Sequence, residues 1–405
     1  MRSMRRIPIL VGGATATLLG LAAAPATASL TATGAVTAIT SPASHRAAER
    51  ASSIYSILGT GDAVTGVRGS SNGRVVLTGG AQTGNGTEAL PFLYRGRPTR
   101  AATGAAVTVL TPPFPGVTTA MFYGPDTHTF NPSAIPSGQV RAVGSYESSS
   151  APSGVRNQGM IYLGAVSGVG GSWTSIDVPA YGTHTFGDVR ACPRGRADCY
   201  VMDTIPHSTM GDLAVGNYDL NPTKRDPVSG NAFIYNLIRH RWTLLQMNGS
   251  LSTQTTLYGI WQDGGNKSDN YTLAGGSSAS GSQMGLLMSY NDRTGKVGRP
   301  RYYSYRNASA RYTHFEGITA VPGGFNIVAE SSAQSSSLAF IPFNARTRTY
   351  GTARWYPADV AASPLCASGC GFISGDTVYQ DSVMGLYIPT GSTKANTYLA
   401  PVHGR

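Results

Sequence analysis

One short unit recurs along most of this chain. Each copy has a strand-like run that ends in small residues and, after a loop, a second run that ends in an aromatic residue. The first runs of five copies lie at 74–80, 140–146, 213–218, 271–277 and 326–330, and a less regular sixth copy follows at 375–388. Repeats of about 40–60 residues are typical of propellers, in which each copy forms one four-stranded sheet, called a blade. The copies in this chain are about 55–70 residues long.

A single blade cannot bury both of its faces, so six blades packed around an axis would supply the core. Near-identical segments at Trp173-Thr-Ser-Ile176 and Trp242-Thr-Leu-Leu245 indicate that the copies also have closing strands. Apolar runs at 53–58 and 397–402 flank the array, and we expect them to share the closing blade, which removes open sheet edges. The sequence therefore predicts an all-β, six-bladed β-propeller in one domain at 53–405.

The segment before the array has a different character. Three arginines precede an apolar run at 7–24, and Ala26-Thr27-Ala28 fits the small-x-small cleavage site of a secretory signal peptide at 1–28. A twin-arginine signal and a lone transmembrane helix are the competing interpretations. Residues 29–52, rich in Ala, Thr and Ser, lack periodicity and predict a flexible leader. We expect a secreted, extracellular protein without a membrane span.

The composition agrees with export. The chain has 51 glycines in 405 residues and only 13% charged residues, which is typical of a turn-rich extracellular β protein. Its net charge is +11, and basic residues alternate with tyrosines at 293–306. Such a surface can hold nucleic acid, hold an acidic glycan, or simply keep a protein soluble. Because export is expected, we predict a monomer whose partner is an extracellular glycan, a cell-wall polymer or a protein, and no nucleic acid.

The four cysteines form two close pairs, Cys192 with Cys199 and Cys366 with Cys370. Outside the cytosol, such pairs predict two local disulfides. A zinc site of four thiolates is the alternative. Neither pair has the two-residue spacing usual for zinc, which favours the disulfides.

Part of the repeat is similar to a known pattern. The string at 67–76 followed by Pro91-Phe-Leu-Tyr94, and the string at 135–140 followed by Met160-Ile-Tyr162, resemble the HAF repeats of bacterial extracellular proteins. That pattern runs Gly-Ile-Asn, a turn, Gly-x-Ile-Val-Gly and then an Ala-Phe-Leu-Tyr strand. The resemblance covers most of 63–388 and implies a secreted array of β repeats. It implies no particular reaction.

Histidine is scarce, with seven in 405 residues. Three histidines follow a tyrosine in similar contexts, namely His128 after Tyr123, His184 after Tyr181, and His314 after Tyr312. These stretches stand where the first strand of a blade would line the central channel. His128 and His184 each precede a Phe by two residues, so we expect them to face the same way and to lie within about 10 Å of each other. His314 precedes Phe315 by one residue, a slip that would turn it outward.

Carboxylates beside glycine recur in similar form at Asp62, Asp188, Glu316 and Asp376, and equivalent positions of a ring of blades converge on its axis. Imidazoles and carboxylates that converge on an axis suit a divalent metal or acid–base chemistry. The candidate catalytic residues are His128, His184 and Asp188, and the candidate binding residues are Tyr123, Tyr181, Trp261, His314 and Glu316. The competing interpretation is that the imidazoles only bond neighbouring blades and that the repetition reflects duplication.

Two classes of function fit these features. The first is a propeller whose loop face binds a glycan, a cell-wall polymer or a protein. The second is a polysaccharide lyase or hydrolase in the channel, where histidine takes a proton and a metal or arginine stabilises the developing charge. Metal analysis of the mature protein would bear on both.

Overall fold

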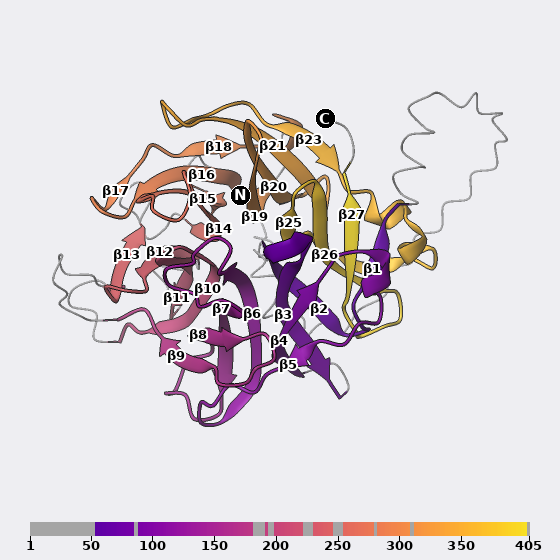
Figure 1. Cartoon of the computed structure of the whole chain (residues 1–405), viewed down its shortest axis with the longest axis horizontal. Coiled ribbons are helices and arrows are strands. Elements are labelled where there is room, and N and C mark those ends of the chain that lie inside the picture. Colours follow the sequence, from indigo (N-terminus) through magenta and orange to yellow (C-terminus); the bar gives the residue numbers. More distant parts are fainter. Residues whose placement is uncertain are drawn as a thin grey trace, which may run out of the picture.

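The computed structural model describes residues 53–84, 88–180, 191–192, 198–221, 230–245, 254–278, 282–307 and 312–402. Six antiparallel sheets stand around one axis (Figure 1). The prediction of an all-β, six-bladed β-propeller is confirmed. The signal peptide predicted at 1–28 and the leader predicted at 29–52 lie outside the described residues.

The first three blades have four strands each. Blade one contains β2 (Asp62–Gly69), β3 (Val75–Thr83), β4 (Glu88–Gly96) and β5 (Thr108–Val109). Blade two contains β6 (Val117–Thr127), β7 (Gln139–Ser148), β8 (Gln158–Ala165) and β9 (Ser172–Ile176). Blade three contains β10 (Val201–Met210), β11 (Leu213–Leu220), β12 (Asn231–Asn236) and β13 (Arg241–Leu245).

In the last three blades one strand is split in two. Blade four contains β14 (Thr255–Gln262), β15 (Asn270–Ser277), β16 (Met284–Asn291), β17 (Lys296–Val297) and β18 (Arg301–Tyr303). Blade five contains β19 (Thr313–Val321), β20 (Gly324–Ser331), β21 (Ser337–Asn344), β22 (Thr349–Tyr350) and β23 (Arg354–Pro357). Blade six contains β24 (Cys370–Ile373), β25 (Thr377–Tyr379), β26 (Ser382–Pro389), β27 (Asn396–Pro401) and β1 (Tyr55–Ile57).

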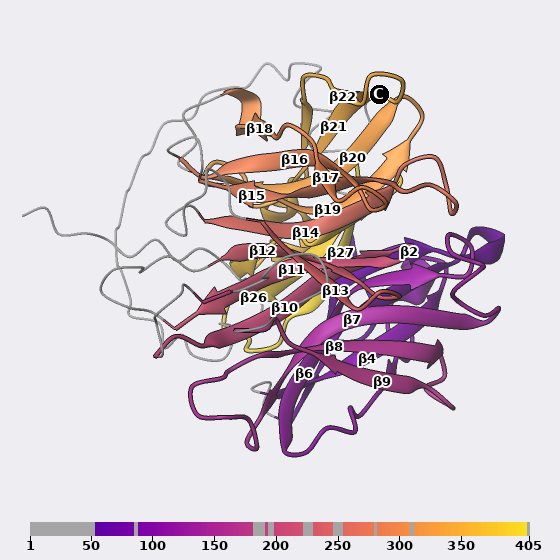
Figure 2. The same cartoon turned by 90° about the vertical axis from the view of Figure 1, so that its left-hand side faces the viewer.

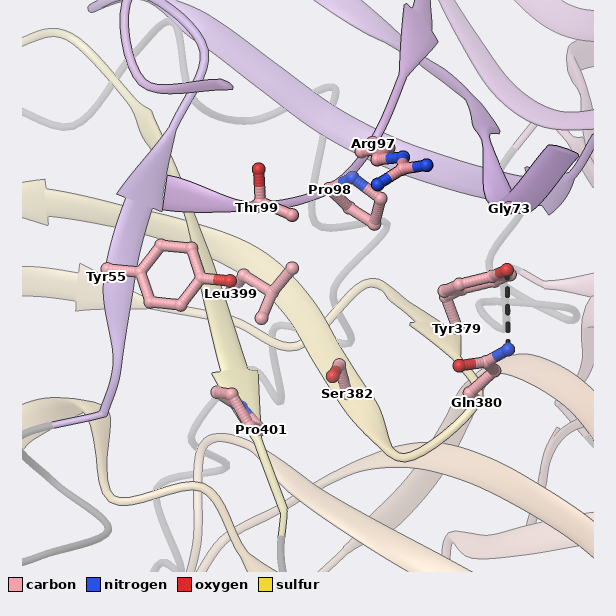
Figure 3. Close-up of a pocket in the computed structure, with 10 residues that line it drawn as sticks. All are labelled: Tyr55, Gly73, Arg97, Pro98, Thr99, Tyr379, Gln380, Ser382, Leu399 and Pro401. Carbon is pink, nitrogen blue, oxygen red and sulfur yellow. Dashed lines mark hydrogen bonds between the residues drawn. The ribbon is translucent and has the colours of Figure 1, made fainter. Parts of the chain in front are cut away.

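The N-terminal strand closes the ring. Strand β1 pairs with β27, with Tyr55 opposite Leu399 and Ile57 opposite Thr397. The ring therefore ends in a blade built from both ends of the array, as predicted from the runs at 53–58 and 397–402. A surface pocket of about 440 Å³ lies at this seam, where Tyr55, Arg97 and Tyr379 surround it together with other residues of blades one and six (Figure 3).

The apolar core lies between the blades. Each pair of neighbouring blades shares at least one buried cluster, as where Val76 and Leu93 of blade one meet Phe122 and Ala142 of blade two. The other five interfaces are built in the same way. A blade therefore becomes stable only beside its neighbours, which is why the sequence repeats one half-buried unit six times.

Both predicted disulfides are present. Cys192 bonds Cys199 with a Cα–Cα distance of 5.7 Å, and Cys366 bonds Cys370 at 5.2 Å. All four thiols are thereby consumed, so the alternative of a four-thiolate zinc site is wrong. In the part of the chain that the structure describes, no helix is long and apolar enough to cross a membrane.

Candidate active site in the central channel

The innermost strand of each blade has an irregularity at the same level. In the first five blades the ladder to the second strand skips at Thr65, Tyr123-Gly124, His207, Tyr258 and Glu316-Gly317. In the sixth blade, residues 374–376 interrupt the strand between β24 and β25. A bulge frees one residue from the ladder and re-aims its side chain. Six polar or aromatic residues thus share one level of the channel: Thr65, Tyr123, His207, Tyr258, Glu316 and Asp376.

Glycine next to the bulge lets neighbouring strands approach the axis. A Cβ atom on Gly66 would lie 1.7 Å from the carbonyl oxygen of Tyr123, and one on Gly124 would lie 2.7 Å from the Cα of Ser208. These distances are too short for any larger residue. The glycines therefore set the narrow spacing of the inner ring.

Aromatic rings form an unbroken row across four of the inner strands. The ring of Tyr123 lies 4.8 Å from that of His207, which lies 3.6 Å from that of Tyr258. Tyr258 in turn lies 4.6 Å from His314 on β19. Burial lowers the pKa of His207 and of His314 to about 3, so both imidazoles are neutral at physiological pH.

His314 is held on both sides of its ring. Its Nδ1 lies 2.7 Å from Oε1 of Glu316, and its Nε2 lies 2.6 Å from the hydroxyl of Thr256 on the neighbouring blade. A Cβ atom at Gly276 would come within 2.3 Å of the ring, so glycine is required there. Because both ring nitrogens have partners, the orientation of the imidazole is fixed.

Three carboxyl groups gather beside this histidine. Glu330 on β20 accepts a hydrogen bond from the backbone N–H of Gly375 at 3.0 Å, and Asp376 accepts one from the hydroxyl of Ser374 at 3.0 Å. Burial raises the pKa of Glu316 and of Glu330 well above the ordinary value, and the nearby carboxyl groups raise that of Glu330 further. Burial and the neighbouring Glu316 raise the pKa of Asp376 to about 8. The cluster therefore holds protons at neutral pH.

Beyond this level, toward the C-terminal ends of the inner strands, one arginine connects several blades. Arg68 is buried there and donates to the carbonyl oxygens of Pro125 and Thr209 at 3.1 and 3.4 Å. Its guanidinium lies 5.2 Å from the ring centre of Trp261 and 6.0 Å from that of Phe130. We call Arg68, Phe130 and Trp261 the plug, and its contacts join four blades.

The side chain of Glu316 is 12% exposed, so the cluster keeps some contact with solvent.

The structure brings some of the predicted residues together. Tyr123, His314 and Glu316 belong to the channel cluster, and His314 faces into it, which contradicts the expectation that it turns outward. Trp261 belongs to the plug. His128 lies in the turn after β6, where its Nδ1 is 2.7 Å from the carbonyl oxygen of Ile135.

Other predicted residues cannot be placed. Tyr181, His184 and Asp188 lie outside the described residues, so the expected proximity of His128 and His184 stays a prediction. The inner strand of blade three is β10, and the histidine it brings to the channel is His207. Among the described residues, no three His, Cys, Asp or Glu side chains are grouped so that they could hold a metal ion.

Sequence reasoning missed three members of the cluster, namely His207, Tyr258 and Glu330. A signal for Tyr258 was present, because a polar or aromatic residue followed by glycine recurs at 65–66, 123–124, 258–259 and 316–317. Each pair marks the bulge of an inner strand. In blades three and six the glycine is replaced by Ser208 and Thr377, which hides the pattern.

No protein-family model matches the chain, and no curated protein matches it by sequence. Among solved structures, it is similar to an alpha-L-arabinofuranosidase from Fusarium graminearum, with 11% identity, coverage of 87% of this chain and 98% of that one, and a TM-score of 0.48. It is also similar to a luciferin-regenerating enzyme, with 10% identity, coverage of 85% of this chain and 94% of that one, and a TM-score of 0.44. A GH43_1 enzyme from Xanthomonas citri has 11% identity, coverage of 76% of this chain and 96% of that one, and a TM-score of 0.42. The activity proposed below rests on the channel residues alone.

Proposed function

We propose that this protein is an exported hydrolase that cleaves a glycosidic bond in the central channel. The observation that carries the proposal is the group of buried carboxyl groups beside a fixed, neutral histidine. Hydrolysis of a glycoside uses two carboxyl groups, one that gives a proton to the leaving oxygen and one that is ionised. Glu316 and Asp376 stand at one level on neighbouring inner strands and can divide these tasks.

The roles of Glu316 and Asp376 follow from the electrostatic coupling of their carboxyl groups. Two carboxyl groups that repel each other do not ionise together, so the pair loses its protons in two separate steps. We assign the first ionisation to Glu316, because an N–H at Nδ1 of His314 would donate to its carboxylate while Thr256 donates to Nε2. Asp376 keeps the second proton and acts as the general acid. Glu330, bonded to the N–H of Gly375, positions the strand that carries Asp376.

The aromatic row supplies the binding surface of the proposed site. His207 donates through Nε2 to Oδ1 of Asn217 at 2.6 Å, which makes Nδ1 its accepting nitrogen. Tyr123 and Tyr258 present rings on either side of it. Rings with polar edges suit a sugar, which offers both C–H faces and hydroxyl groups.

The sequence is also compatible with a polysaccharide lyase, but the channel residues favour this reaction less. Removing a proton next to a uronate carboxylate requires a cation for the developing charge. The six residues at the bulge level include no lysine or arginine, and Arg68 is committed to the plug. A cluster that holds protons is better suited to protonate a leaving group.

The test is a panel of neutral and acidic polysaccharides incubated with the purified mature protein at pH 6. We expect new reducing ends from at least one polysaccharide, without the absorbing unsaturated product that a lyase makes. The unsaturated product would contradict the hydrolase and favour the lyase. Binding of a glycan without any cleavage would contradict both and leave a binding propeller.

A further inference from the structure

A second concave surface lies between blades four and five, away from the channel. It has a volume of about 1030 Å³ and is lined by the end of β16, by β17 and β18, and by the turn at 347–350. Figure 2 shows β16, β17 and β18 beside β20, β21 and β22. We name this surface the blade 4–5 groove.

The groove is strongly basic. Four of its lining residues are cations, namely Lys296, Arg299, Arg301 and Arg348, and none is a carboxylate. Lys296 and Arg299 are exposed, and neither has a carboxylate partner among the described residues. Arg301 donates to the carbonyl oxygen of Tyr350, which fixes it across the groove. A surface of this kind complements a chain of negative charges.

Arg348 stands at one edge of the groove. It has φ 53°, a left-handed conformation that the matching turn positions of blade three and blade four share, His240 at φ 51° and Gly295 at φ 69°. The guanidinium of Arg348 is held at the groove edge by Asp263 at 3.0 Å and by the carbonyl oxygen of Tyr271 at 3.3 Å.

We propose that the blade 4–5 groove binds an anionic polysaccharide through its carboxylate or phosphate groups. The groove offers charge but little exposed ring surface. Of its three tyrosines, Tyr290 and Tyr350 are only 2% and 5% exposed and Tyr302 is half-buried. Nucleic-acid bases would need ring faces on which to stack. The proposal is independent of the channel chemistry, since no groove residue belongs to the carboxyl cluster.

The test compares two double variants of the mature protein. Lys296→Gln with Arg299→Gln removes two groove charges, and Arg74→Gln with Arg97→Gln removes two exposed charges of blade one as a matched control. The probes are polygalacturonate, a glycerol phosphate polymer, neutral dextran and duplex DNA. Affinity is measured at low salt for each probe.

We expect at least one anionic polysaccharide to bind, and the groove variant to bind it about tenfold more weakly, with much less change in the control. The anionic probe that binds more tightly identifies the charged group. The proposal would be overturned if dextran bound as tightly as the anionic polysaccharides, or if duplex DNA bound more tightly than they do. It would also be overturned if both variants lost the same affinity, or if neither anionic polysaccharide bound.

Discussion

Replacing Glu316 by glutamine is expected to lower kcat for glycoside hydrolysis by about 10²- to 10⁴-fold, the range for loss of one acid–base group. Glutamine keeps the size of the side chain and can still bond Nδ1 of His314, but it cannot ionise. The measurement is the release of reducing ends from the best polysaccharide of the panel. An unchanged thermal unfolding curve would show that the variant is folded and that the loss of activity is due to the missing carboxylate.

Glu88→Gln is the matched control, because Glu88 is exposed at the start of β4 and touches no channel residue. Its activity should equal that of the unmodified protein. An active Glu316→Gln variant would remove Glu316 from the mechanism. A variant that is inactive only because it unfolds would show instead that Glu316 is structural.

Replacing Asp126 by asparagine is expected to destabilise the protein by about 1–3 kcal/mol, the cost of leaving a buried N–H group without its acceptor. Asp126 is fully buried, and its two carboxylate oxygens accept hydrogen bonds from the backbone N–H groups of Thr127 at 2.9 Å and of Gly211 at 3.0 Å. Asparagine has only one accepting oxygen, so one of these two N–H groups loses its partner in the variant. Burial raises the pKa of Asp126 to about 6, although Arg68 and Arg141 lower it. Denaturant unfolding at pH 7.5, where Asp126 is ionised, measures the change.

Asp269→Asn is the control for this second prediction. Asp269 pairs with Arg293 at 3.1 Å on the surface, where the two side chains are 44% and 75% exposed. Exposed ion pairs contribute about 0–1 kcal/mol, so the change should be small. Similar losses in the two variants would contradict the view that the plug and its carboxylate hold the inner ring together.

The fold could be predicted because its signals are local and repeated. Alternation, turn glycines and copied closing strands occur in each unit, and even the pairing of 53–58 with 397–402 follows from the need to close the ring. The disulfides followed from spacing. The HAF resemblance, the signal peptide and the monomeric state stay predictions.

The site was only partly predictable, because it depends on which residues different blades bring to one level. Glu330 is on a second strand, and nothing local connects it to Gly375, 45 residues away. His314 was expected to face outward because simple alternation was assumed, whereas the bulge after Phe315 changes the register of β19. His207 lacks the tyrosine that drew attention to the other histidines.

The most direct test of the central claim is the pH dependence of kcat between pH 5 and 9. Asp376, as a general acid with a pKa of about 8, is active while protonated, so kcat should fall as the pH rises through about 8. Folding raises the pKa of Asp376, so the stability that this group contributes is present at low pH and is lost as the pH rises through about 8. Folding is therefore monitored in parallel with kcat. We predict that kcat falls near pH 8 while the protein stays folded. The residual activity of the Asp376→Asn variant should show no such fall. A kcat that stays level or rises through pH 8 to 9 would contradict the account.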